Sequence, residues 1–97
     1  MDLIMNKYET VILISNKIKD EERKSVVEKI KKIINANGTI TKVDEIGLRK
    51  LAYEVRKHNE AFYYVIYFES EPSFIAELER NYRIIDEILK FIVVKQD

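Results

Sequence analysis

The 97-residue chain contains no cysteine, two glycines, one proline and one histidine. Without cysteine there are no disulfides, no thiolate zinc sites and no cysteine nucleophile. His58 has no second histidine with which to form a metal site. Gly38 and Gly47 are too far apart to form a glycine-rich phosphate loop. We therefore expect no metal, no cofactor and no small-molecule substrate.

Long apolar runs and an excess of one charge are also missing. No stretch approaches the ~20 apolar residues of a membrane helix, and "MDLIMNKYE" lacks the features of a signal peptide. The 17 basic and 17 acidic residues give a formal net charge of +0, which argues against a protein that coats nucleic acid with its whole surface. A local basic surface is compatible with this balance. We expect one domain, residues 1–97, in which residues 1–5 are a short extension.

The remaining polar residues do not form a recognisable catalytic motif. The serines have no base partner at motif spacing. Asp44 and Glu45 are adjacent on a predicted strand and would point to opposite faces. His58 lies in a predicted turn, where we expect a solvated loop histidine. The sequence therefore predicts that the protein is not an enzyme.

The order of predicted elements indicates the fold. Alternating β-branched and aromatic residues predict strands over residues 6–15, 39–55, 61–69 and 87–95, the second irregular around Gly47. Apolar stripes at helical spacing predict helices from Asp20, a plausible N-cap, to Asn37 and over residues 70–83. We expect Gly38 to end the first helix in a left-handed conformation and Asn59 to take positive φ in the turn over residues 56–60.

This βαββαβ order predicts an α+β, ferredoxin-like domain, in which two helices cover one face of a four-stranded antiparallel sheet. The other face would then be unusually apolar for a surface in water, which favours a surface for a partner protein over a face that strand ends and side chains partly cover. Unpaired RNA bases stacking on its aromatics are a further possibility, although the strand lacks the octamer typical of that mode. The partner-face candidates are Val11, Leu13, Tyr63, Val65, Tyr67, Ile92 and Val94.

A short run, "GLRKLAYEVRK", gathers four of the chain's cations between residues 47 and 57. Its first nine residues resemble the signature segment of the bacterial small-subunit ribosomal protein six family. The similarity continues in "NKYETVILI", "FYYVIYFE" and "LERNYRIIDEILKFIVVK", in the family's order and spacing. Glu54, Val55 and Ala61 depart from the proline, isoleucine and glycine that are common in members, which affects the rigidity of the bend and the hairpin conformation. The acidic tail of some members is not expected after Asp97.

The resemblance implies that the protein lies in the cytoplasm, in the small ribosomal subunit. There it would bind the central domain of small-subunit ribosomal RNA together with ribosomal protein eighteen of the same subunit. The family pattern carries over to Lys7, Lys50, Tyr53, Lys57 and Lys90 as RNA-binding residues. Arg49 and Arg56 are added because of their charge within the same run.

Two alternatives stay open. Any single lysine could be a solvated surface cation, and Tyr53 could be a half-buried anchor whose hydroxyl binds a local partner. The whole chain could also be a stand-alone ferredoxin-like module for protein interaction or small-ligand binding, because this fold hosts many functions.

Overall fold

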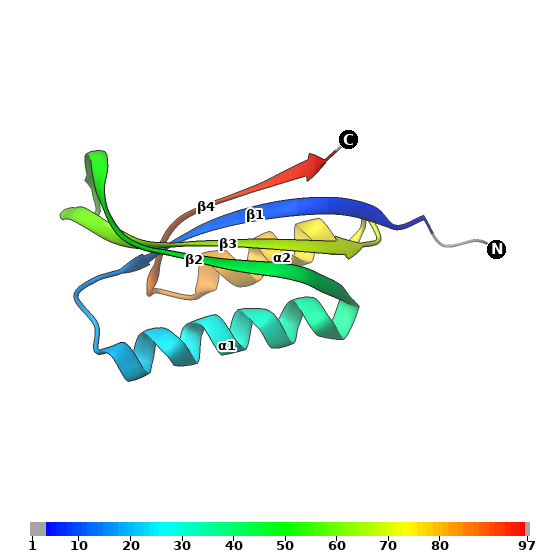
Figure 1. Cartoon of the computed structure of the whole chain (residues 1–97), viewed down its shortest axis with the longest axis horizontal. Coiled ribbons are helices and arrows are strands. Elements are labelled where there is room, and N and C mark those ends of the chain that lie inside the picture. The colour runs from blue at the N-terminus through cyan, green and yellow to red at the C-terminus, as the bar shows by residue number, and fades with distance from the viewer. Residues whose placement is uncertain (1–3, 97) are drawn as a thin grey trace.

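The computed structural model describes residues 4–96 and has the element order βαββαβ (Figure 1). The elements are β1 (Asn6–Ser15), α1 (Asp20–Asn37), β2 (Gly38–Val55), β3 (His58–Ser70), α2 (Phe74–Ile84) and β4 (Ile88–Gln96). The four strands form one antiparallel sheet in the order β2-β3-β1-β4, and both helices lie against the same face. The ferredoxin-like α+β prediction is confirmed. Within residues 4–96, no helix has the length and apolarity needed to span a membrane.

The short extension expected at the start falls partly outside the described residues, which exclude 1–3. Ile4 and Met5 precede β1 and are exposed. Neither residue belongs to the core of the domain.

Strand β1 lies in the middle of the sheet, as its apolar faces predict, and is tied to α2 through Thr10. The Thr10 hydroxyl donates to the carbonyl oxygen of Ile92 at 3.1 Å, so its oxygen accepts from the Tyr82 hydroxyl at 3.2 Å. Burial raises the pKa of the Tyr82 hydroxyl, since the phenolate would lose its hydration. Every member of this interior network therefore has a partner.

Helix α1 packs through a stripe that includes the buried residues Val26, Val27, Ile30 and Ile34. The prediction that Asp20 is the N-cap is wrong, because the cap position is occupied by Lys19 and has no side-chain hydrogen bond. Asp20 is the first helical residue, where its carboxylate suits the positive end of the helix dipole. It accepts a hydrogen bond of 2.7 Å from the Arg23 guanidinium, one turn later.

Gly38 ends α1 for a reason other than the one predicted. Its φ of −170° is extended, so no left-handed conformation is required. A Cβ at this position would collide with the backbone carbonyl oxygen of Glu69 on β3. Position 38 needs a glycine because β2 begins in close contact with β3. At the end of α1, the Asn37 side chain donates a hydrogen bond of 3.0 Å to the carbonyl oxygen of Ile33.

The hairpin between β2 and β3 turns through two residues. Arg56 and Lys57 have φ of 48° and 63°, and Val55 pairs with His58 across the turn. Positive φ at both central residues is typical of a type I′ hairpin, whose twist matches that of the strands. The prediction for Asn59 is therefore wrong, because this residue already belongs to β3.

Strand β2 is irregular near the hairpin. Gly47 has φ of 96°, and the pairing shifts between Glu45 and Gly47, as the sequence predicts. A larger shift follows Lys50, because residues 51–54 lie opposite the single residue Asn59. This bulge belongs to the hairpin arm, which we define as residues 48–62. The arm rises from the sheet on the side opposite the helices (Figure 1).

Candidate functional site

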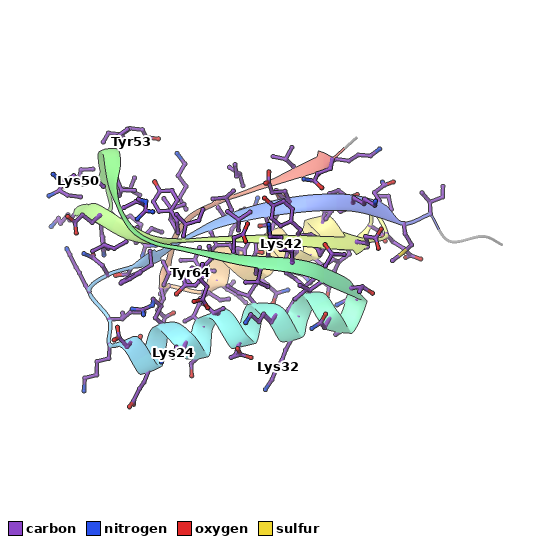
Figure 2. The ribbon with its side chains drawn as sticks, in the orientation of Figure 1. Lys24, Lys32, Lys42, Lys50, Tyr53 and Tyr64 are labelled. Atoms are coloured by element: carbon purple, nitrogen blue, oxygen red, sulfur yellow. The ribbon has the colours of Figure 1, made fainter. Side chains whose placement is uncertain are left out.

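The hairpin arm carries most of the predicted RNA-binding residues. Lys50 and Tyr53 both lie on its raised end (Figure 2). Arg49, Lys50 and Lys57 are exposed to solvent, and the Arg49 guanidinium donates to the carbonyl oxygen of its neighbour Leu48 at 2.9 Å. The bend thus presents cations to solvent at one end of the molecule.

Tyr53 and Lys90 meet across the arm and β4. The Lys90 ammonium lies 2.6 Å from the Tyr53 hydroxyl and 5.2 Å from the centre of its ring. The bulge makes this contact possible, because it carries Tyr53 over the open face of the sheet. Between arm and sheet lies a cavity of about 110 Å³ that both residues line, together with Leu13 and Tyr63. The structure therefore adds a cation from β4 to those of the arm.

Arg56 is tied to the protein. Its guanidinium donates to the carbonyl oxygen of Ile88, the first residue of β4, at 3.1 Å. This hydrogen bond occupies one of the guanidinium N–H groups and connects the hairpin turn to β4. Arg56 thus contributes to the position of the turn as well as to its charge.

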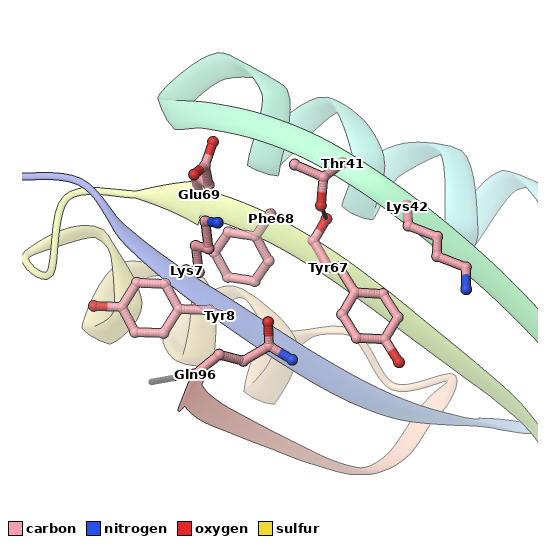
Figure 3. Close-up of a pocket in the computed structure, with 8 residues that line it drawn as sticks. All are labelled: Lys7, Tyr8, Thr41, Lys42, Tyr67, Phe68, Glu69 and Gln96. Carbon is pink, nitrogen blue, oxygen red and sulfur yellow. Dashed lines mark hydrogen bonds between the residues drawn. The ribbon is translucent and has the colours of Figure 1, made fainter.

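Lys7 is not brought together with the arm cations. Ser15, at the other end of β1, pairs with Ala61 of the arm. Lys7 lies eight residues before Ser15, and at about 3.3 Å per residue these two β1 residues are about 26 Å apart. Lys7 borders a separate cavity of about 430 Å³, beside Tyr67 and Lys42 (Figure 3). The Glu9 carboxylate raises the pKa of the Tyr67 hydroxyl through a hydrogen bond, so acidic and basic groups are mixed here.

The predicted partner face is divided by burial. Leu13 and Val65 are only 8% and 7% exposed, and Leu13 lines the cavity beneath the hairpin arm, so neither offers much surface to a partner. Val11, Tyr63 and Tyr67 are half-buried. Ile92 and Val94 on β4 are 49% and 48% exposed. Among the predicted partner-face residues, the two most exposed therefore lie on β4, and Ile92 and Lys90 line a groove of about 260 Å³ there.

His58 is not the solvated loop residue that the sequence predicts. It is only 9% exposed, and its Nε2 atom lies 2.7 Å from the hydroxyl oxygen of Ser15. Its Nδ1 atom lies 2.8 Å from the carbonyl oxygen of Arg56. Both ring nitrogens are therefore engaged within the protein, and the ring lies between the end of β1 and the hairpin turn.

Lys17 is a cation that sequence reasoning missed. Its ammonium donates to the carbonyl oxygen of Lys57 at 2.9 Å, so the connection between β1 and α1 lies against the hairpin turn. The two residues are 40 positions apart, and no local pattern indicates that they meet.

Among residues 4–96, no three acidic or histidine side chains are grouped to hold a metal ion.

The sequence model of ribosomal protein S6 matches residues 7–95 of this chain. The chain belongs to the ribosomal protein S6 family. The S6 family resemblance predicted from the signature segment is therefore confirmed. The match covers the hairpin arm, the β1–α1 connection and all of β4 except Gln96, the three parts that form the candidate site.

Individual relatives agree with the family match. Small ribosomal subunit protein bS6 of Helicobacter acinonychis is 47% identical over 94 residues, which are 96% of this chain and 66% of that protein. The chain thus spans just under two thirds of that relative's length. The bS6 protein of Alkaliphilus oremlandii is 40% identical over 91 residues, covering 94% and 97% of the two chains.

A solved structure supports the fold. The crystal structure of 30S ribosomal protein S6 from Thermotoga maritima superposes with a TM-score of 0.91 at 39% sequence identity. The superposition covers 96% of this chain and 89% of that one. The S6 fold thus accounts for the complete ferredoxin-like sheet and both helices.

Tyr53 is 63% exposed, more than the half-buried anchor considered from the sequence, and this sets its expected contribution to stability. We expect Tyr53→Ala to lower the free energy of unfolding by about 1 kcal/mol, because only part of the ring leaves water. Tyr53→Phe should change it by less than about 0.5 kcal/mol, since the hydroxyl makes only an exposed hydrogen bond. Urea titrations of both variants would measure this, and a decrease above about 3 kcal/mol for Tyr53→Ala would contradict it.

Proposed function

We propose that this S6 family chain is a structural, non-enzymatic component of the small ribosomal subunit in the cytoplasm. It binds the central domain of small-subunit ribosomal RNA together with ribosomal protein eighteen. The observation that carries the RNA contact is the meeting of the arm with β4 at Tyr53 and Lys90, 2.6 Å apart. Cations from separate strands are grouped there on one side of the molecule.

The charge balance supports a local contact with phosphates. The chain's formal net charge of +0 gives no general attraction to RNA. Lys50 and Lys57, by contrast, are exposed on the arm and turn, where a phosphate can replace water around each ammonium. Such contacts fix the position of a protein on RNA and carry little sequence information.

The apolar edge of the sheet supports a protein partner. Ile92 and Val94 are about half exposed on β4, an edge strand whose outer side has no neighbouring strand in the sheet. Removal of apolar side chains from water is the main favourable contribution to most protein association. A basic partner seated there would add positive charge next to the arm cations and so strengthen RNA binding by the pair.

The RNA contact is tested by replacing Lys50 and Lys57 with alanine. We expect the double variant to bind the RNA–partner complex more weakly and to have a salt slope that is shallower by about two units, one for each phosphate that is no longer neutralised. The melting temperature of the free protein should hardly change, because exposed cations contribute less than about 0.5 kcal/mol. Binding measured at several salt concentrations would give the slope.

The matched control for this test is a pair of lysines away from the arm. Lys24 and Lys32 project from the outer side of α1, which faces away from the sheet (Figure 2). Lys24→Ala with Lys32→Ala removes the same charge, and we expect the salt slope to stay unchanged. Equal slopes for the two double variants would show that only total charge matters and would contradict a specific arm contact.

Co-sedimentation separates this function from the stand-alone module considered above. A structural ribosomal protein should move with small subunits through a sucrose gradient of cell lysate. A chain found only at the top of the gradient, with free proteins, would favour the stand-alone module.

A further inference from the structure

We propose that Ser15 and His58 are positioning residues for RNA binding, which hold the cationic hairpin turn in the geometry that reaches phosphates. This inference rests on the proposed RNA contact of the arm. We call the hydrogen-bonded series that joins the β1–α1 connection to the turn the latch, and it consists of Ser15, Lys17, Arg56, Lys57 and His58.

The latch is a continuous series of hydrogen bonds. The backbone N–H of Lys17 donates to the Ser15 hydroxyl oxygen at 3.1 Å. That hydroxyl lies 2.7 Å from Nε2 of His58, and Nδ1 of the same ring lies 2.8 Å from the carbonyl oxygen of Arg56. In parallel, the Lys17 ammonium donates to the carbonyl oxygen of Lys57 at 2.9 Å. Both backbone carbonyls of the turn are thus held by residues outside it.

The direction of each bond follows from the groups involved. A carbonyl oxygen only accepts, so Nδ1 of His58 carries the proton that reaches Arg56. In the neutral ring Nε2 is then the acceptor, and the Ser15 hydroxyl donates a hydrogen bond to it. The Ser15 oxygen remains free to accept from the Lys17 N–H. Ser15 and His58 are 7% and 9% exposed, so little water competes for these bonds.

The turn needs such support because of its backbone. Arg56 and Lys57 both have positive φ, although neither is a glycine, and each such residue costs roughly 1–2 kcal/mol relative to ordinary conformations. A turn without external bonds could relax and move both side chains. The latch, with the bond from Arg56 to Ile88 on β4, holds the turn from two sides.

This role makes an unusual prediction for salt dependence. Loss of the latch removes no cation. It should nevertheless move the Lys57 ammonium away from the RNA phosphate that it is proposed to contact. We expect Ser15→Ala to weaken binding to the RNA–partner complex roughly fivefold and to make the salt slope shallower by about one unit. A residue that only stabilises the fold would leave the slope of the folded protein unchanged.

His58→Asn provides an independent variant, because its amide can still donate to the Arg56 carbonyl while it cannot reach Ser15. It should reproduce the effect of Ser15→Ala. The two changes break the same bond, so the double variant should bind no more weakly than either single one. Ser25→Ala, a serine exposed on α1, is the matched control and should bind like the wild-type chain.

The experiment measures affinity and salt slope for these variants beside the Lys50/Lys57 double variant, with thermal melts to establish that each is folded. Unchanged slopes in folded Ser15→Ala and His58→Asn, beside an altered slope for the lysine variant, would overturn the positioning role alone. Unchanged slopes in all of them would overturn the arm contact and with it the latch. Additive effects in the double variant would also contradict the latch.

Discussion

Gly38→Ala is expected to lower the free energy of unfolding by about 3 kcal/mol, because overpacking against a rigid neighbour costs roughly 1–3 kcal/mol and sometimes more. The added Cβ would meet the carbonyl oxygen of Glu69, a backbone atom of β3 that cannot rotate away. Either β2 must move outward or α1 must end earlier. Chemical denaturation of the purified variant measures the decrease in stability.

Gly47→Ala is the matched control, since it makes the same chemical change in the same strand. No backbone atom crowds that site, where the nearest atom to a new Cβ is the end of the Arg49 side chain at 4.0 Å. Its φ of 96° makes alanine strained, and we expect a decrease of about 1–2 kcal/mol. A smaller decrease for Gly38→Ala than for Gly47→Ala would contradict the close approach of β2 to β3.

RNA binding should be about 100-fold tighter with ribosomal protein eighteen present than with the chain alone, near the upper end of ordinary coupling energies. The reason is that the chain has no net charge and exposes Ile92 and Val94 on the edge strand β4, beside the Lys90 cation that would face RNA. Titration of a central-domain RNA fragment, with and without the partner, measures the ratio. Equal affinities would rule out the cooperative mechanism.

Ile92→Ser separates the partner contribution from the RNA contact. The substitution removes apolar surface from the edge of β4, adds no charge beside Lys90 and leaves every cation of the arm in place. Binding by the chain alone should change little, whereas the enhancement by the partner should fall. An enhancement that survives this change would place the partner on a different surface.

Much of the fold could be predicted because its signals are local. The buried stripe of α1, with Ile30 and Ile34 one turn apart, follows directly from helical periodicity. The central position of β1 follows from its two apolar faces, and the irregularity of β2 follows from Gly47. Such features depend on neighbours within a few residues, which the sequence displays.

The features that could not be predicted depend on residues far apart in the chain. His58 is buried in contact with Ser15, which is 43 positions away. The polar and charged residues of "RKHNE" around His58 indicate an exposed turn and not a buried histidine. The bulge after Lys50 depends on the register with β3 and not on local propensity. For the same reason, Tyr53 and Lys90 were both candidates from the sequence, while their direct contact needed the structure.

The central position of β1 also determines when this domain can fold during synthesis. β1 is the first strand to be made, and its two neighbours in the sheet are β3 and β4, the third and fourth strands. The contact between Thr10 and Tyr82 closes a loop of 72 positions. Non-local pairing of this kind slows folding, because the entropy of loop closure is lost before the contacts form. A ribosome translating this chain must therefore finish β4 before the four-stranded sheet can be completed.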